Sequence, residues 1–213
     1  MTMKFYQHPM SSFCWKVSIA LYEAGIPFEP VTVNLGDPDV REEYLKISPF
    51  GKLPALVDGK RVVNETSIII EYLTLKYPAA ASLMPKDPEE ALKVRALDRF
   101  YDLYINLGLL RIAGDNLRPE DKREPISIAM VLGDMKTALG IVERDLANRT
   151  FAAGEAFTMA DCSAVPSLFY AQRLIPYQPD FPNIVRYLER LQKRPSVARV
   201  IKDAEPYFHL LPL

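Results

Sequence analysis

The stretch Ser11-Ser12-Phe13-Cys14-Trp15 places two hydroxyls between an apolar run and the helix pattern that follows it. A hydroxyl at a helix start lies beside unpaired N–H groups and the positive end of the helix dipole, where anions are favoured. A thiol with an ordinary pKa of roughly 8.5 would ionise more readily there. Ser11 is therefore our candidate donor to a sulfur atom. Because serine is also a preferred N-cap residue, capping alone accounts equally well for this motif.

Cys14 follows Ser11 at the spacing of a redox Cys-x-x-Cys motif whose first cysteine is replaced by serine. Without that nucleophilic first cysteine, disulfide exchange is not expected. Cys14 also falls on the apolar side of the helix, so we predict a packed side chain, with a reactive thiol as the alternative.

A second stretch, Ser48 to Leu56, has Pro54 directly before an apolar run that predicts a strand. Proline cannot pair inside a central strand. A cis bond before Pro54 would turn the chain and leave the backbone of Leu53 free to pair with an extended peptide ligand. Lys52 would supply a cation for a ligand carboxylate. The alternative is a trans proline at an ordinary strand start.

A third stretch, Glu65-Thr66-Ser67, opens a predicted helix. Free N–H groups and a hydroxyl at a helix start can hold a carboxylate, and Glu65 can pair with an amine. An α-amino acid group carries both charges. The alternative is helix capping by Asn64 or Thr66.

The elements that position these stretches alternate between strand and helix in the first third of the chain. The helix after Ser11 has an apolar stripe formed by Cys14, Val17, Leu21 and Ala24, and Lys16 and Glu23 lie off that stripe. Asp58-Gly59 joins two short apolar runs, which is a strong hairpin signal. The predicted order is β-α-β-α-β-β-α, with strands in 3–8, 27–35 and a hairpin in 54–64, and helices in 15–24, 41–47 and 67–77. This order predicts a thioredoxin-like domain over residues 1–78.

Prolines and alanines in residues 79–88 predict an irregular linker. Beyond it, amphipathic stretches predict a helical bundle over residues 89–213. The predicted helices are Glu89 to Asn116, Glu124 to Leu146, Met159 to Leu174 and Asn183 to Lys193. The fold class is α/β followed by all-α.

Composition narrows the functional classes. The 213 residues carry a formal charge of -1, so nucleic acid is not an expected partner. The sequence shows no apolar run near the ~18 residues of a membrane span and no signal peptide pattern, which predicts a cytoplasmic protein. Two cysteines, Cys14 and Cys162, and two distant histidines, His8 and His209, predict no metal site.

Together the three stretches resemble the cytosolic glutathione transferase family, over the whole chain. The resemblance implies that Ser11 hydrogen-bonds the glutathione sulfur beside Phe13, and that Leu53 before cis Pro54 pairs with the cysteinyl backbone. It further implies that Glu65 and Thr66 hold the γ-glutamyl end and that Lys52 contacts the glycyl carboxylate. Serine at the first position resembles the theta and zeta classes and many bacterial members.

A motif in the second half supports the resemblance. Phe157-Thr158-Met159-Ala160-Asp161 matches the family's buried capping box, in which Thr158 caps a helix, Asp161 bonds back to its N–H and Phe157 packs on Cys162. The motif predicts a role in stability and makes Cys162 structural.

Two residues depart from the family pattern. Asp39 stands where many theta-like members carry histidine or glutamine, and an acid there would repel the glycyl carboxylate. The zeta class, which isomerises maleylacetoacetate, resembles Ser-Ser-Cys-x-Trp, whereas the third position here is Phe13.

The resemblance implies an enzyme that conjugates glutathione, its co-substrate, to an apolar electrophile. A glutathione-dependent isomerase of the maleylacetoacetate type, a reductive lyase and a non-catalytic binding protein stay open as alternatives. A pocket for the second substrate would use Tyr101, Tyr104 and the tail residue Phe208, although the tyrosines could instead be bundle core. The resemblance also implies a homodimer.

Overall fold

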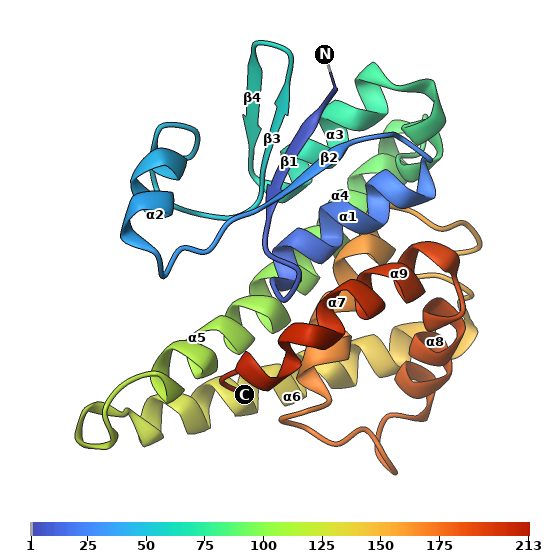
Figure 1. Cartoon of the computed structure of the whole chain (residues 1–213). Helices are drawn as coiled ribbons and strands as arrows, with labels where there is room; N and C mark the ends of the chain where they lie inside the picture. The colour runs from blue at the N-terminus through green and yellow to red at the C-terminus, as the bar shows by residue number, and fades with distance from the viewer. Residues whose placement is uncertain (1) are drawn as a thin grey trace.

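The first domain is built on a four-stranded sheet with the order β2-β1-β3-β4 (Figure 1). The computed structural model describes residues 2–213. β2 runs parallel to β1, whereas β3 is antiparallel to both β1 and β4. Gly59, at φ +63, makes the tight turn between β3 and β4 that the Asp58-Gly59 pair predicts. The strands are β1 (Lys4–Gln7), β2 (Glu29–Thr32), β3 (Ala55–Asp58) and β4 (Arg61–Asn64).

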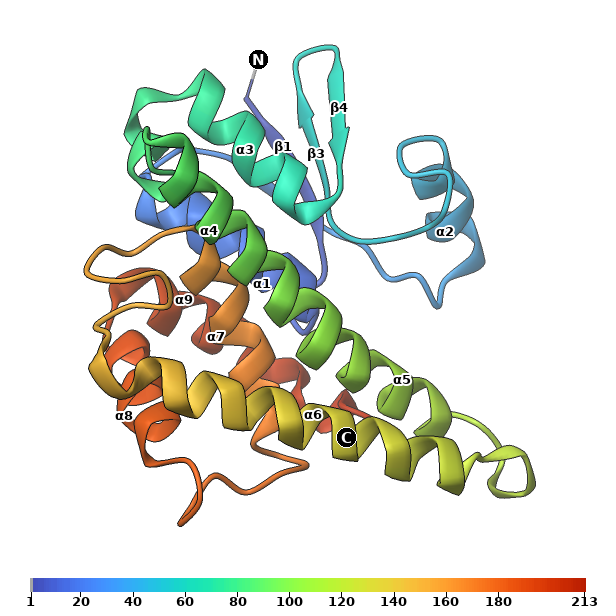
Figure 2. The ribbon, with the colours of Figure 1, turned by 180° about the vertical axis from the view of Figure 1, so that it is seen from behind.

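Helices cover both faces of this sheet. α1 (Ser12–Glu23) and α3 (Thr66–Lys76) lie on the face toward the second domain, and α2 (Pro38–Leu45) lies on the other (Figures 1 and 2). Alternation along β3 explains the two layers, because Leu56 joins the main core and Ala55 packs in a smaller cluster with Tyr44 of α2. The thioredoxin-like arrangement is confirmed.

The second domain is a bundle of helices with short connections. Its first predicted helix consists of two α-helices joined by a π-helical segment, and a further helix, α9, follows the last predicted one. The elements are α4 (Pro88–Phe100), the π-helix η2 (Tyr101–Asn106), α5 (Leu107–Asn116), α6 (Pro125–Asp145), α7 (Met159–Ala171), α8 (Pro182–Gln192) and α9 (Pro195–Ala204). The described part of the chain also has four 3-10 helices: η1 (Pro78–Leu83), η3 (Glu120–Lys122), η4 (Leu146–Asn148) and η5 (Glu205–Leu210).

The stretch between the domains is more regular than the sequence predicts. Residues 79–88 were expected to be irregular, but η1 occupies the first half of this stretch and α4 begins at Pro88. Proline at the first position of a helix loses no hydrogen bond, because the N–H at that position has no intrahelical partner. The prolines therefore begin these helices and do not interrupt them.

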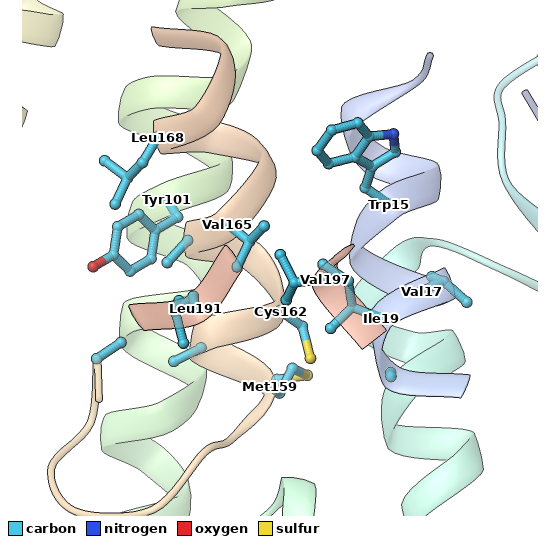
Figure 3. Packing of buried hydrophobic residues seen from close by; sticks show 14 of the residues in the cluster. Trp15, Val17, Ile19, Tyr101, Met159, Cys162, Val165, Leu168, Leu191 and Val197 are labelled. Atoms are coloured by element: carbon cyan, nitrogen blue, oxygen red, sulfur yellow. The ribbon is translucent and has the colours of Figure 1, made fainter. Parts of the chain in front are cut away.

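One continuous apolar core joins the two domains. Ile19 of α1 points toward Met159 and Cys162 of α7, and Trp15 lies one turn nearer the start of α1 (Figure 3). Val17 points to the opposite side of α1. α1 and α7 are both buried on nearly every side. The orientation of the first domain is thereby fixed against the bundle.

By length and composition alone, the helical stretch Pro125–Asn148 could cross a membrane. In the structure it packs against α5 and α8, and its buried residues include Val131, Met135 and Leu139. It also carries charged residues such as Glu143, whose carboxylate accepts the N–H of Asn183 at 2.9 Å. These contacts are those of a bundle helix.

Candidate functional site

The three stretches singled out in the sequence meet at one edge of the sheet. β1 ends at Gln7, and the register pairs Tyr6 with Ala55 at the start of β3. Ala55 also pairs with Asn64 at the end of β4. The loop before α1, the Leu53-Pro54 bond and the start of α3 therefore lie at the same end of three adjacent strands.

Ser11 is the N-cap of α1 and is half-buried. Its Oγ accepts the backbone N–H of Cys14 at 3.3 Å. An accepting hydroxyl keeps its own hydrogen available for donation. Ser11 can thus cap the helix and donate to a ligand at the same time, so the two interpretations of the motif are compatible.

Cys14 is a packed side chain with no solvent exposure. Its Sγ accepts the N–H of His8 at 3.5 Å. Burial raises the pKa of the Cys14 thiol to about 11, against smaller opposing contributions from hydrogen bonds with Ser11 and His8. A thiol with this pKa is protonated at neutral pH, so Cys14 is a poor nucleophile.

The Leu53-Pro54 bond is cis, as the resemblance implies. The carbonyl oxygen of Lys52 accepts the hydroxyl of Tyr44 at 2.7 Å and that of Ser48 at 2.9 Å, which fixes the backbone before the bond. Within residues 2–213, neither backbone group of Leu53 takes part in a hydrogen bond. The Lys52 side chain is exposed. This backbone can receive an extended ligand.

Glu65 stands at the start of α3 with φ 68 and ψ 119. It is the one non-glycine residue with a positive φ among residues 2–213. Such a conformation costs on the order of 1–3 kcal/mol and is maintained only by surrounding contacts. The Glu65 side chain is exposed, and Thr66 next to it is buried.

A buried group of charges, which the sequence analysis missed, lies beneath this turn. Lys16 of α1 was expected off the buried stripe, but its side chain is 1% exposed. Its Nζ lies 2.6 Å from Asp98 and 2.7 Å from Asp102, two acids that are themselves buried. Nζ also donates to the Ser67 hydroxyl at 2.9 Å, which in turn donates to Asp98 at 2.6 Å. We call Lys16, Ser67, Asp98 and Asp102 the charge cluster.

The pKa values of the two acids in the charge cluster are shifted in opposite directions. Burial disfavours ionisation of Asp98, but Lys16 and hydroxyl donors outweigh it and hold the pKa of Asp98 below its ordinary value. Burial, with the like charge of Asp98, raises the pKa of Asp102. Arg99, half-exposed, also contacts Asp102. A pattern in the sequence could have predicted this cluster. Asp98 and Asp102 follow the buried Val94 at four-residue spacing, which places both acids on the core face of their helix.

The tail approaches the loop that carries Ser11. The ring of Trp15 packs on Phe169 at 5.0 Å, and Phe169 stacks on Phe208 at 5.9 Å. Tyr170 donates its hydroxyl to the carbonyl of Met10 at 2.9 Å. These contacts bring Phe208 to the α1 end of the site.

The two tyrosines expected beside Phe208 are placed differently. Tyr101 is 2% exposed, and its ring lies near Leu168 of α7 in the bundle core (Figure 3). Of the two placements that the sequence left open for Tyr101, a substrate pocket and the bundle core, the structure has the core. Tyr104 is exposed and packs on Phe100 at 5.3 Å.

Asp39 is exposed in the first turn of α2, where its N–H donates to the Asp37 carboxylate at 3.0 Å. This cap also explains why α2 begins at Pro38, earlier than predicted.

The predicted capping box is present at the start of α7. The Asp161 carboxylate accepts the N–H of Thr158 at 2.8 Å, the N–H of Ala152 at 2.8 Å and the hydroxyl of Tyr187 at 2.6 Å. Phe157 packs edge-on against Phe151 at 5.9 Å. These contacts belong to the interior of the bundle.

Comparisons with known proteins agree with this arrangement. Residues 5–81 match the family model for the glutathione S-transferase N-terminal domain, and residues 100–195 match that for its C-terminal domain. The chain belongs to the glutathione S-transferase family. Homologues named glutathione S-transferases identify the chain as a glutathione transferase enzyme. The family is generally soluble and cytosolic.

Two relatives and one solved structure illustrate the similarity. Glutathione S-transferase Z2 of Arabidopsis thaliana is 30% identical over 210 residues, covering 96% of this chain and 92% of the relative. A probable maleylacetoacetate isomerase of Caenorhabditis elegans is 28% identical over 205 residues, covering 94% of each chain. A crystal structure of a glutathione S-transferase from Methylobacillus flagellatus with bound glutathione superposes with a TM-score of 0.87 at 25% identity, covering 93% of this chain and 98% of that one.

Proposed function

We propose that this glutathione transferase joins the sulfur of glutathione to an electrophilic, largely apolar small molecule, with Ser11 as the catalytic hydroxyl. The observation that supports this proposal most directly is the hydrogen bonding of the Ser11 hydroxyl. Its oxygen accepts from Cys14 N at 3.3 Å, which leaves its hydrogen free to point at a ligand sulfur. Donation to a thiolate favours the ionised form and lowers the thiol pKa.

The remaining site residues hold glutathione in the correct orientation in this proposal. The free backbone of Leu53, beside cis Pro54, pairs with the cysteinyl residue as a short strand would. Glu65 and Thr66 hold the γ-glutamyl amine and carboxylate. Lys52 meets the glycyl carboxylate from the opposite end, and Phe13 packs beside the sulfur.

The reaction then follows from one bound thiolate. The thiol proton leaves to solvent, the thiolate attacks the electrophilic carbon, a C–S bond forms and the leaving group departs with its electron pair. The Ser11 hydroxyl stabilises the thiolate and is not consumed. Phe208 and the exposed ring of Tyr104 are the proposed contacts for the apolar electrophile.

Steady-state conjugation of 1-chloro-2,4-dinitrobenzene tests this function. Ser11→Ala is expected to lower kcat/KM by about 100-fold, as for loss of one donor to a developing anion. Ser12→Ala is the matched control, because the buried neighbouring hydroxyl is given no role. The rise of kcat/KM with pH should move to higher pH in Ser11→Ala and should stay in place in Ser12→Ala. Equal rates in wild type and Ser11→Ala would remove Ser11 from the mechanism.

Glutathione-dependent isomerisation is a second candidate, favoured by the similarity to a zeta-class transferase and to a probable maleylacetoacetate isomerase. In that reaction glutathione adds to the substrate and is released again. Incubation with maleylacetoacetate and product analysis separates the candidates, since only conjugation consumes glutathione. Reductive cleavage would instead yield oxidised glutathione.

A cytoplasmic homodimer is the proposed working form. Support comes from large apolar side chains exposed on two neighbouring helices, namely Ile68 and Leu75 on α3 and Leu92 on α4. α3 and α4 are joined by the Glu71–Arg95 pair at 2.9 Å, so these side chains can form a common surface. Exposed apolar surface of this kind is typical of subunit contacts.

A further inference from the structure

The carbonyl group of Lys52 is held by two buried hydroxyls, just before the cis bond at Pro54. The hydroxyl of Tyr44 donates to the Lys52 carbonyl oxygen at 2.7 Å, and that of Ser48 donates to it at 2.9 Å. A carbonyl oxygen has two lone pairs, so these donors occupy both. Tyr44 is 2% exposed and Ser48 is 4% exposed, so solvent competes little with either hydrogen bond.

This anchored carbonyl belongs to the same peptide group as the N–H of Leu53. The atoms of a peptide group lie in one plane, and in a trans group the C=O and the N–H point in opposite directions. The bond between Lys52 and Leu53 is trans, since the cis bonds within residues 2–213 lie at Pro54 and Pro179. Fixing the carbonyl therefore fixes the direction of the Leu53 N–H, which forms no hydrogen bond in that part of the chain.

The surroundings of Tyr44 explain how its hydroxyl reaches this carbonyl. Tyr44 is the one buried residue of α2, a helix that the structure describes over its whole length and that lies apart from the other helices (Figure 2). Its side chain lies in the smaller cluster with Val33 and Ala55, and its ring packs on that of Tyr6 at 6.0 Å. The Tyr44 carbonyl accepts the N–H of Ser48 at 2.9 Å, which brings the two hydroxyls together at the end of α2.

Both hydroxyls are donors at neutral pH. Burial raises the pKa of Tyr44, so its hydroxyl stays protonated, and a serine hydroxyl does not ionise in this range. The Lys52 carbonyl is therefore oriented by contacts within the chain itself. A group that is already oriented in the free protein loses less conformational freedom when a ligand binds, and this favours affinity.

We propose that Tyr44 and Ser48 are positioning residues for glutathione, which direct the Leu53 N–H toward the cysteinyl carbonyl of the ligand before it binds. The inference rests on the proposed function, because it takes glutathione as the ligand of Leu53. Neither hydroxyl touches the ligand in this proposal. Their loss should therefore weaken the binding of glutathione and leave the thiolate stabilisation assigned to Ser11 unchanged.

Isothermal titration calorimetry with S-methylglutathione tests this role, because this ligand has no thiol to ionise. The double variant Tyr44→Phe with Ser48→Ala should bind it about 20-fold more weakly than wild type, since both hydrogen bonds that direct the Leu53 N–H are lost. Tyr44→Phe alone keeps the ring and one donor and should lose about threefold. In steady-state conjugation, KM for glutathione should rise in parallel, whereas kcat should change by about twofold at most.

Tyr6→Phe is the matched control. It removes a hydroxyl from the ring that packs on Tyr44 and leaves both donors to Lys52 in place, so it should bind S-methylglutathione as wild type does. A second ligand separates positioning from a general structural effect. In an analogue of S-methylglutathione whose cysteinyl carbonyl is replaced by a methylene group, the Leu53 N–H has no acceptor. Wild type and the double variant should bind this analogue equally.

Two results would overturn this inference alone. One is equal affinity for S-methylglutathione in wild type and the double variant, and the other is an equal loss of affinity for both ligands. A wild-type chain that binds no S-methylglutathione would overturn the proposed function and this inference with it. Thermal unfolding checks that each variant is folded, and Tyr44→Phe provides the same comparison if the double variant does not fold.

Discussion

The ammonium of Lys16 lies 2.6 Å from the carboxylate of Asp98, and both side chains are 1% exposed. Lys16 is on α1, the helix capped by Ser11, and Asp98 is on α4 of the second domain. Ser67 connects the same pair to the start of α3, two residues after the strained Glu65. One buried contact therefore ties together the two helix starts of the candidate site and the bundle.

Lys16→Met should destabilise the protein strongly. The substitution keeps the length and apolar stem of the side chain but removes the buried cation of Asp98 and Asp102, which leaves only the half-exposed Arg99 beside them. Loss of one partner from a buried ion pair costs about 3–5 kcal/mol in unfolding free energy. Urea denaturation followed by circular dichroism measures this loss.

The control for Lys16→Met is Lys4→Met, which removes an exposed lysine paired with Glu29 at 3.8 Å. Exposed pairs contribute about 0–1 kcal/mol, so this variant should unfold near the wild-type midpoint. A double variant, Lys16→Met with Asp102→Asn, should recover part of the loss, because one uncompensated charge is removed. Equal midpoints for Lys16→Met and wild type would contradict the structural importance of the cluster.

Asp161→Ala should lower stability without changing the chemistry of folded enzyme. The carboxylate is buried and accepts hydrogen bonds from Thr158, Ala152 and Tyr187, so its removal leaves several buried donors unpaired. We expect a loss of about 3 kcal/mol or more, beyond the ~1 kcal/mol of an ordinary helix cap. Thermal unfolding and kcat/KM per folded molecule are measured together. A large fall in kcat/KM at unchanged stability would count against a purely structural role.

Much of the site could be predicted from sequence because its signals are local. The Asp58-Gly59 turn, Pro54 before a strand and the Thr158–Asp161 spacing each depend on a few adjacent residues, and all three structural features are present. The convergence of Ser11, Pro54 and Glu65 at one end of the strands follows from the strand order of the thioredoxin-like domain, which the alternation of strand and helix signals predicts. The roles assigned to Ser11 and Glu65 in binding glutathione stay predictions.

The features that sequence failed to predict depend on contacts between distant segments. Lys16 can be buried because its ammonium forms an ion pair with Asp98, which lies far along the chain. Tyr101 lies in the bundle core, which is the alternative that the sequence left open for it, and the π-helical form of this segment was not predicted. α9 was missed although Pro195 begins it and Val197, Val200 and Ala204 give a helical apolar stripe.

The Glu23–Arg194 contact should make stability depend on pH in the acid range. Arg194, at the start of α9, donates two hydrogen bonds to Glu23 of α1, at 2.9 and 2.6 Å. Burial alone would raise the pKa of Glu23, but donors from Arg194 and Ser196 outweigh it and hold the pKa below its ordinary value. A lowered pKa adds stability above the unfolded-state value of about 4.3, and that stability is lost as pH falls through the folded-state value.

Glu23→Gln is therefore expected to be about 1 kcal/mol less stable than wild type at pH 7, and the difference should shrink as the pH falls through the lowered pKa of Glu23 in the folded protein. Unfolding free energies from urea titrations at several pH values give this comparison. Glu29→Gln, an exposed acid paired only with Lys4, serves as the control and should show little pH-dependent difference. A difference in unfolding free energy between wild type and Glu23→Gln that grew as the pH fell would contradict a lowered pKa of Glu23 in the folded protein.

The proposed homodimer should depend on the apolar surface of α3 and α4. Leu75 is 87% exposed and Leu92 is 60% exposed, so neither stabilises the single chain by burial. Leu75→Glu with Leu92→Glu should leave the monomer fold intact but place like charges in the contact, which weakens association about 100-fold or more. Sedimentation equilibrium measures the dimer dissociation constant. Leu117→Glu, a change at another exposed leucine, should leave that constant unchanged, because the residue directly follows α5 and the end of α5 lies far from α3 (Figure 1). A wild-type chain that sediments as a monomer at every concentration, or a double variant that associates like wild type, would exclude this surface as the subunit contact.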